Sequence, residues 1–302
     1  VKDTPGAGHV KITATGGGEK SVYETDIEIR SVRRPQIKVT PVTLEAGKSW
    51  KGTVGFPGVE GTNSLVLEMS DVQPVNLSTR LSYLLGYPHG CVEQITSKVF
   101  PQLYLSGFAS LTREQEQSTE ATVKEVICRL RSYQTVDGSF SYWPGGTAPN
   151  AWGTVYAIHF LLEAEKKGYL VPEGMKRNAL NDLSRIARNW KPEASYSAES
   201  EEMTQAYRLF VLALGQVAEV GAMNRLKESK TLMSMSRYLL AAGYALIGRP
   251  DVSKELVVKT TALTTACSGY DQTFGSDLRD TSIRLMTVSY THLRAHETGA
   301  YL

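Results

Sequence analysis

A cysteine and a glutamine that could react with each other stand in the stretch YPHGCVEQ, residues 87–94. Gly90 and Pro88 break the preceding helix, so CVEQITSKVF is expected to begin a new one. Positions three apart on a helix have Cβ atoms about 5–6 Å from each other, which brings the sulfur of Cys91 to the carboxamide carbon of Gln94. A helix N-terminus favours the thiolate, which is the competent nucleophile. Attack on the carboxamide would expel ammonia and leave an internal thioester.

The same stretch has a purely structural interpretation. A lone cysteine is usually a small buried hydrophobe, and the first turn of a helix favours an acidic side chain such as Glu93. By spacing alone this interpretation is favoured over the thioester. His89 offers a similar choice. We expect it to be a turn residue packed beside Tyr87, although an imidazole two residues from the sulfur could also act as a base.

The composition is that of an ordinary soluble globular protein, with 41% hydrophobic and 21% charged residues in a chain of 302. Thirty-three basic and 31 acidic side chains give a net charge of +2, and both signs are interspersed, which argues against a nucleic-acid or anionic-membrane surface. No apolar run reaches the length of a membrane span. Cys91, Cys128 and Cys267 are too scattered for a disulfide framework and form no CxxC pair. We therefore expect no metal and no cofactor.

Two kinds of pattern divide the chain near residue 75. Residues 9–30 alternate around Gly16-Gly17-Gly18, and further short β segments follow the linker Arg33-Arg34-Pro35. The first 75 residues are therefore expected to be all-β, of sandwich type. Apolar residues then recur with the helical period, which predicts helices over 76–87, 112–134, 150–168, 174–190, 200–219, 231–248 and 250–264. Antiparallel helix pairs without a strict repeat indicate an α/α toroid or array rather than a four-helix bundle.

Both ends of the chain carry expectations of their own. The chain opens on Val1 with residues that read as the middle of a β domain, so we interpret it as a fragment. The stretch VSYTHLRAHET, Val288–Thr298, looks like one reading frame of the mosaic-end adapter of transposase-based sequencing libraries. We expect residues 288–302 to be an assembly artefact. His292 and His296, which lie in this stretch, are therefore not candidates for a functional role.

Longer segments resemble a known family. The segment LLGYPHGCVEQITSKVFPQLYL (84–105) is similar to the thioester segment of the alpha-2-macroglobulin family, especially of its bacterial branch, where a Tyr-Pro-x-Gly-Cys-x-Glu-Gln run recurs. Later segments resemble the same domain in the same order: DGSFSYWPGG (137–146) with the helix after it, EEMTQAYRLFVLAL (201–214) and VGAMNRLKE (220–228). The resemblance covers roughly residues 60–265 and makes the thioester the favoured interpretation.

The resemblance implies an α+β multidomain fragment, in which N-terminal β-sandwich pieces are followed by an α/α toroid thioester domain. Residues 1–32 would be the end of a macroglobulin-like β-sandwich domain. Residues 33–75 would be the first half of a CUB-type β domain, and residues 76–287 a truncated thioester domain.

The resemblance also implies a function. Cys91 would supply the sulfur and Gln94 the acyl carbonyl, with Glu93 and His89 in supporting roles. In the family, a protease cuts a bait region, the thioester is exposed, and it acylates a lysine amine of that protease. We therefore expect a piece of a broad-spectrum protease inhibitor rather than an enzyme, with proteases as covalent partners and a periplasmic or extracellular location. Membrane anchorage through a segment upstream of Val1 stays open.

Two features qualify this interpretation, and two other functions stay open. Val92 stands where vertebrate members have glycine, but bulkier residues at this position resemble those of bacterial members, so Val92 does not count against a thioester. Residues 190–206 lack the histidine of complement-type members, which favours amines over hydroxyls as acceptors. The first alternative function is an opsonin-like attachment to foreign surfaces through the same thioester. The second is an α/α-toroid enzyme such as a glycosidase, which needs a pair of acidic residues; the sequence shows no such pair in a distinctive context.

The remaining candidate side chains are expected to be structural. An aromatic group could form a carbohydrate platform, but we expect it to shield the thioester or fill the mouth of the toroid; its members are Phe140, Tyr142, Trp143 and Trp152. Cys128 lies on the apolar face of its helix and is expected in the core. His159 is expected to be a satisfied core histidine.

Overall fold

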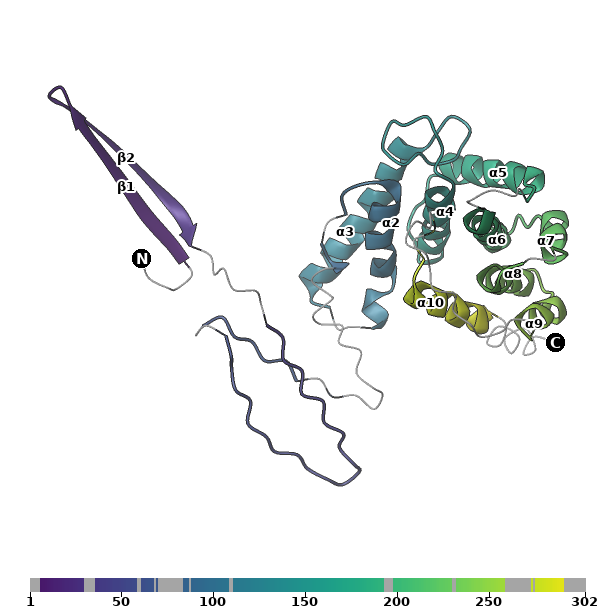
Figure 1. The fold of residues 1–302 in the computed structure, drawn as a ribbon, viewed down its shortest axis with the longest axis horizontal. Coiled ribbons are helices and arrows are strands. Elements are labelled where there is room, and N and C mark those ends of the chain that lie inside the picture. The colour runs from purple at the N-terminus through teal and green to yellow at the C-terminus, as the bar shows by residue number, and fades with distance from the viewer. Residues whose placement is uncertain are drawn as a thin grey trace. The chain divides into compact units, whose positions relative to one another are not determined.

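The chain divides into two units, Val1–Val75 and Asn76–Leu302, which we describe separately (Figure 1). The structure is a computed structural model. It describes residues 6–29, 36–58, 61–67, 69, 84–86, 88–108, 111–192, 198–229, 232–258, 273 and 275–290. Most of the helix expected over 76–87 lies outside these residues, as do Tyr87, Cys267, His292 and His296.

The first unit contains the β-hairpin that the glycine-centred alternation predicts. Strand β1 (Gly6–Gly16) pairs antiparallel with β2 (Glu19–Ile29), in a register that runs from Gly6 opposite Ile29 to Gly16 opposite Glu19. The two turn residues, Gly17 and Gly18, both have positive φ, at 60° and 84°. A two-residue hairpin turn of this kind matches the twist of the strands and requires residues that tolerate positive φ. The three glycines thus set the register.

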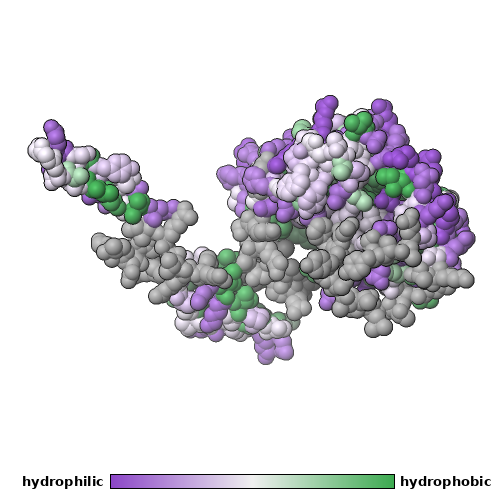
Figure 2. All heavy atoms as spheres, turned by 45° about the horizontal axis from the view of Figure 1, so that its top comes forward, coloured by the Kyte–Doolittle hydropathy of each residue, from purple (hydrophilic) through white to green (hydrophobic). Residues whose placement is uncertain are grey.

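The strands expected after residue 35 are not formed. Residues 36–58 and 61–67 have irregular backbone, and apolar side chains such as Ile37, Val39 and Trp50 are exposed there. Alternation makes a segment fit for a sheet, but a strand also needs a neighbour that takes up its N–H and C=O groups. Among the described residues, that neighbour is missing for this segment. Figure 2 shows apolar side chains at the surface of this unit.

The second unit is helical. Helices occupy the six ranges predicted between residues 112 and 264, whereas the helices over 220–227 and 277–288 lie outside the predicted ranges. The bounds of the helices are α2 Val92–Val99, α3 Arg113–Leu130, α4 Ala151–Lys166, α5 Glu173–Asn189, α6 Ala198–Leu214, α7 Val220–Lys227, α8 Ser234–Leu246, α9 Pro250–Val258 and α10 Asp277–Val288. Short 3₁₀ turns lie at η1 Phe100–Leu103, η2 Leu105–Gly107 and η3 Arg131–Tyr133. The helix predicted over 200–219 ends earlier, at Leu214, and Gln216 beyond it has a φ of 61°. No helix in the described part of the chain is long and apolar enough to cross a membrane.

The helices form two layers, an inner and an outer one. Helices α2, α4, α6, α8 and α10 contact one another in succession, whereas α3, α5, α7 and α9 pack against them from outside (Figure 1). Burial follows the same division. Every residue of α6 from Glu202 to Leu214 is buried, but α5 buries only one face, which includes Met175 and Leu183. This arrangement confirms the expected α+β fold with an α/α toroid.

Local signals explain where several helices begin. Thr112 and Gln115 form a capping box at the start of α3, in which each side chain accepts from the backbone N–H of the other residue. The side chain of Asn150 caps α4 by accepting from Gly153 N at 2.7 Å. Capping residues of this kind typically contribute about 1 kcal/mol each. They therefore help to place the loops on either side of α3 and α4.

The loop of residues 134–149 joins η3 to α4 and is held against α5. The side-chain amide of Gln134 donates to the carbonyl of Met175 at 3.0 Å, and the hydroxyl of Ser139 donates to the buried carboxylate of Asp182. Gly138 has a φ of 108°, and a Cβ there would overlap the carbonyl oxygen of Asn178. The loop can therefore approach α5 this closely only with glycine at 138.

We predict that Gly138→Ala destabilises the helical unit more than the matched variant Gly145→Ala. Gly145 also has a positive φ, of 75°, but no atom lies within 4 Å of a Cβ built there. Both variants should lose about 1–2 kcal/mol from backbone strain, and only Gly138→Ala should lose about 1–3 kcal/mol more from the clash with α5. Urea titration followed by helical circular dichroism measures both losses, and equal losses would contradict the close packing.

Candidate functional site

Cys91 and Gln94 meet at the N-terminus of α2. Cys91 is the N-cap residue, with extended backbone (φ −71°, ψ 170°), and Gln94 is the third residue of the helix. The carboxamide oxygen of Gln94 accepts from the backbone N–H of Cys91 at 3.1 Å, and the two residues form a capping box. Cys91 is a free cysteine with 1% of its surface exposed. The two residues of the predicted pair are therefore bonded to each other at the start of α2, through the backbone N–H of Cys91 and the carboxamide oxygen of Gln94.

Gly90 makes this arrangement possible. Its φ is 116°, a conformation that residues with a Cβ rarely adopt. A Cβ at this position would also overlap the carboxamide oxygen of Gln94 and lie 2.9 Å from the carboxamide carbon. Any larger residue at 90 would therefore displace the side chain of Gln94 from its place beside Cys91.

The turn in front of Cys91 is held by the end of α3 and by η3. The hydroxyl of Tyr133 donates to the carbonyl of Gly90 at 2.8 Å. The guanidinium of Arg129 donates to the carbonyl of Pro88 at 3.1 Å. Tyr133 is fully buried, so its hydroxyl has a fixed position. Sequence reasoning missed both residues, because they follow the motif by about 40 positions and carry no local signal.

Tyr142, in the loop of residues 134–149, is bonded to the start of α2. Its carbonyl accepts from the backbone N–H of Val92 at 3.0 Å. A side-chain interaction with Cys91, followed by burial, raises the pKa of Tyr142. Tyr142 is 38% exposed, whereas Cys91 is buried.

The other members of the aromatic group have different surroundings. Trp143 is exposed and its ring meets that of Tyr142 edge-on, with centroids 5.5 Å apart. Phe140 is a core residue, and Trp152 packs on Tyr207 with centroids 5.1 Å apart. Of these four aromatic residues, Tyr142 is bonded to the motif, through its carbonyl and the backbone N–H of Val92.

Val92 and Glu93, between the two reacting residues, point to other partners. Val92 is fully buried, and a Cβ on Gly153 would overlap its side chain, so α2 and α4 are in close contact there. The carboxylate of Glu93 accepts from the hydroxyl of Ser97 at 2.7 Å. The side chain in the motif's acidic position is therefore engaged one turn along α2.

The two remaining histidine candidates, His89 and His159, differ in their exposure to solvent. His89 is exposed, while the sulfur two residues later is buried. His159 is buried, and its Nδ1 lies 2.8 Å from the hydroxyl of Tyr207. Burial lowers the pKa of His159 to about 4, so this imidazole is neutral at ordinary pH. The expectation of a satisfied core histidine at 159 is confirmed.

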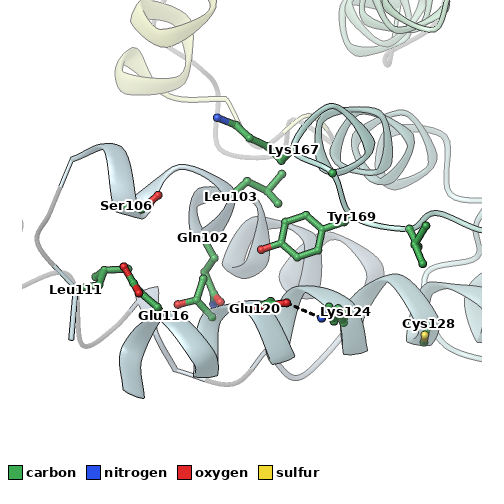
Figure 3. A pocket seen from close by; sticks show the side chains of 13 residues that line it. Gln102, Leu103, Ser106, Leu111, Glu116, Glu120, Lys124, Cys128, Lys167 and Tyr169 are labelled. Atoms are coloured by element: carbon green, nitrogen blue, oxygen red, sulfur yellow. Dashed lines mark hydrogen bonds and ion pairs between the residues drawn. The ribbon is translucent and has the colours of Figure 1, made fainter. Parts of the chain in front are cut away.

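The expectation that Cys128 belongs to the core is wrong. The buried face of α3 is formed by Val123, Val126, Ile127 and Leu130. Residue 128 is turned about 100° from Ile127, so its side chain points away from that face and is exposed. It lines a pocket of about 760 Å³ between η1, α3 and the turn after α4 (Figure 3). Neither Cys91 nor Gln94 lines this pocket.

Comparisons with known proteins match the region of the chain that contains Cys91 and Gln94. The family model of the A-macroglobulin TED domain matches residues 64–205. Alpha-2-macroglobulin of Escherichia coli (strain K12) is 26% identical over 321 residues, which cover 98% of this chain and 19% of that protein. The chain thus spans about a fifth of the length of the curated relatives it matches.

Two solved structures share the fold. Trypsin-activated alpha-2-macroglobulin from Escherichia coli is 26% identical, with a TM-score of 0.59 over 69% of this chain and 15% of that one. Salmonella alpha-2-macroglobulin reacted with methylamine is 25% identical, with a TM-score of 0.59 over 73% of this chain and 16% of that one. With the two-layered helical unit and the Cys91–Gln94 pair at the start of α2, these similarities show that the chain belongs to the bacterial alpha-2-macroglobulin family and that its thioester-domain region covers much of its length.

Proposed function

We propose that Cys91 and Gln94 form an internal thioester. The observation that carries this proposal is the folded-back side chain of Gln94, whose carboxamide is held beside Cys91 by a 3.1 Å hydrogen bond. In the reaction the sulfur attacks the carboxamide carbon, the C–N bond breaks as the C–S bond forms, and the thiol proton leaves with the nitrogen as ammonia. The N-terminus of α2 favours the negative charge on the attacking sulfur.

The surroundings would protect such a bond. A thioester hydrolyses when water reaches its carbonyl, so it persists only at a shielded site. Cys91 is almost fully buried, Val92 packs closely against Gly153, and the carbonyl of Tyr142 is bonded to Val92 N. These features support a bond that stays intact until the site opens.

We further propose that the thioester serves a broad-spectrum protease inhibitor, which traps a protease and acylates its lysine amines. The names of the two solved relatives, one trypsin-activated and one reacted with methylamine, support this proposal. Amines are the preferred acceptors because residues 190–206 contain no histidine that could redirect the acyl group to hydroxyls. The inhibitor would act once per molecule, since the thioester is not regenerated. Its proposed location is periplasmic or extracellular.

An enzyme in the same fold is the less favoured alternative. A glycosidase needs two free carboxylates that converge on a cavity. Three carboxylates of the helical interior are already engaged: Asp182 by Ser139 and Arg185, Glu202 by the backbone of Met233, and Glu163 by Tyr104 and Lys166.

Opsonin-like surface attachment would use the same thioester and differs only in its target. In the same scheme, residues 1–32 and 33–75 belong to a macroglobulin-like and a CUB-type β domain, and residues 76–287 to the thioester domain.

The thioester is tested by mass. We predict that the intact chain is lighter than its sequence by one ammonia, and that methylamine adds at Gln94, which leaves the chain heavier than its sequence by one CH2 group. Cys91→Ala is the control and should keep the unmodified mass with no methylamine incorporation. Intact and peptide mass spectrometry measure both. An unmodified wild-type mass, together with no amine incorporation, would contradict the thioester.

Gly90 tests the geometry. We predict that Gly90→Ala abolishes the ammonia loss, because a Cβ at 90 occupies the space of the Gln94 carboxamide. Gly168→Ala is the matched control, since Gly168 has a φ of 89° but no atom within 4 Å of a Cβ built there. Both variants should unfold at comparable urea concentrations, and only Gly168→Ala should keep the thioester. If Gly90→Ala formed the thioester normally, the close approach of the Gln94 carboxamide to residue 90 would not be required.

His89 has a separate test. Because its imidazole is exposed and the sulfur is buried, we predict that His89→Ala forms the thioester and reacts with methylamine at a rate within about twofold of wild type. Loss of a general base typically costs at least about 100-fold. The rate of methylamine incorporation, followed by mass, separates the two outcomes, and a large loss would assign the base to His89.

A further inference from the structure

The peptide group between Gly90 and Cys91 is hydrogen-bonded at both of its ends. Its carbonyl, on Gly90, accepts from the hydroxyl of Tyr133 at 2.8 Å. Its N–H, on Cys91, donates to the carboxamide oxygen of Gln94 at 3.1 Å. Hydrogen bonds in such a chain polarise one another, because a donor at the C=O end of an amide draws electron density from its N–H end. The hydroxyl of Tyr133 therefore makes the N–H of Cys91 a stronger donor to Gln94.

The carboxamide oxygen of Gln94 is the atom on which negative charge would develop in acyl transfer. When a nucleophile attacks the carbon of a carbonyl group, the electron pair of the C=O bond moves to the oxygen. A backbone N–H about 2.7–3.1 Å from such an oxygen stabilises the charge, and removal of one donor typically slows the reaction about 100-fold to 1,000-fold. The nitrogen of Cys91 already lies 3.1 Å from this oxygen.

We propose that the backbone N–H of Cys91 stabilises this oxyanion, both when the thioester forms and when an amine opens it, and that Tyr133 is the positioning residue that orients and polarises this N–H. The inference rests on the thioester proposed above and deepens it.

The same oxygen carries the charge in both directions. In formation, the sulfur attacks the carboxamide carbon, the C=O electron pair moves to the oxygen and then returns as the C–N bond breaks, and the thiol proton leaves with the nitrogen as ammonia. In opening, the amine nitrogen forms a C–N bond to the acyl carbon, the oxygen is charged again, and the C–S bond breaks. The proton lost by the amine ends on the sulfur.

Tyr133 is held firmly enough to fix this peptide group. Its side chain is fully buried, and its own carbonyl accepts from the backbone N–H of Ser141 at 2.8 Å and from the Ser141 hydroxyl at 2.9 Å. The guanidinium of Arg129 holds the carbonyl of Pro88 in the same turn at 3.1 Å. A glycine such as Gly90 otherwise leaves the neighbouring peptide group free to rotate. A donor that is fixed before the reaction needs no reorganisation when the charge appears.

A role in anchoring the turn alone makes a different prediction. If the Tyr133 hydroxyl only held the turn in place, its loss would loosen the surroundings of Cys91, and amines would open the thioester at the same rate or faster. If the hydroxyl acts through the N–H of Cys91 on the oxyanion, its loss slows both formation and opening. Tyr133→Phe keeps the buried ring and removes only the hydroxyl, so it separates the two roles.

The first experiment measures two rates on the full chain by intact mass: ammonia loss after cell-free synthesis, and methylamine incorporation at fixed pH. We expect both to be about 10-fold slower in Tyr133→Phe, less than the loss of a whole oxyanion donor, because the N–H of Cys91 remains. Tyr244→Phe is the matched control and should react like wild type, since Tyr244 is 1% exposed and its hydroxyl donates to Asn224 in another part of the helical unit at 2.6 Å. An unchanged or faster opening in Tyr133→Phe would overturn the proposal.

The second experiment observes the N–H of Cys91 directly and does not require a thioester. The chain has three cysteines, so labelling with [15N]cysteine gives three backbone amide signals, and the signal of Cys91 is the one that Cys91→Ala removes. An amide proton resonates further downfield as its hydrogen bond strengthens. We expect Tyr133→Phe to move the Cys91 signal upfield, towards its position in Gln94→Ala, which lacks the acceptor. Tyr244→Phe should leave the signal in place.

The two experiments separate the two proposals. A wild-type chain without ammonia loss refutes the thioester, whatever the amide signal does. An amide signal of Cys91 that is the same in wild type and Tyr133→Phe refutes the polarisation by Tyr133, whether or not the thioester forms.

Discussion

The site depends on one local interaction, the hydrogen bond from the backbone N–H of Cys91 to the carboxamide oxygen of Gln94. In a water-exposed first turn, a glutamine side chain has many rotamers, and ordering it costs free energy. Here the capping box supplies a partner for an N–H that the helix itself cannot satisfy. Gly90 supplies the space, since a Cβ there would collide with the carboxamide. A capping interaction of the ordinary kind thus also orients an electrophile beside a sulfur.

The rest of the helical unit makes this first turn rigid and dry. Helix α2 is only eight residues long, too short to be stable by itself, so its position comes from its neighbours. The inner helix α4 approaches it at Gly153, and the outer helix α3 and η3 hold the turn before Cys91 through Arg129 and Tyr133. The loop that is bonded to α5 also contacts α2, at Val92. Each contact comes from a different part of the sequence, so the toroid must be folded before the site is complete.

The difference between the local interaction at the start of α2 and the tertiary contacts around it explains what the sequence could and could not predict. The proximity of Cys91 and Gln94 follows from a spacing of three on a helix, and the helices follow from a period that burial enforces, so both were predictable. The contacts of Tyr133 and of Tyr142 with the motif depend on tertiary packing and have no local signal. Cys128 was misplaced because it is adjacent to Ile127 in sequence but turned away on the helix. The strands expected over 36–58 are not formed. An alternating pattern predicts which side chains share one face of a strand, but it does not supply a neighbouring strand to pair with.

Protection and opening would place opposite demands on the surroundings of Cys91. A purely apolar cover would protect a thioester by excluding water, but it would also penalise the thiolate that forms when the bond opens, because burial of an unpaired charge is costly. The loop of residues 134–149 lies at this point of the fold, since the carbonyl of Tyr142 accepts from Val92 N at 3.0 Å. Ser139 and Gln134 bond the same loop to α5. The loop can therefore keep its place beside Cys91 only while α2 and α5 keep their relative positions, which links the surroundings of the motif to the packing of the helices.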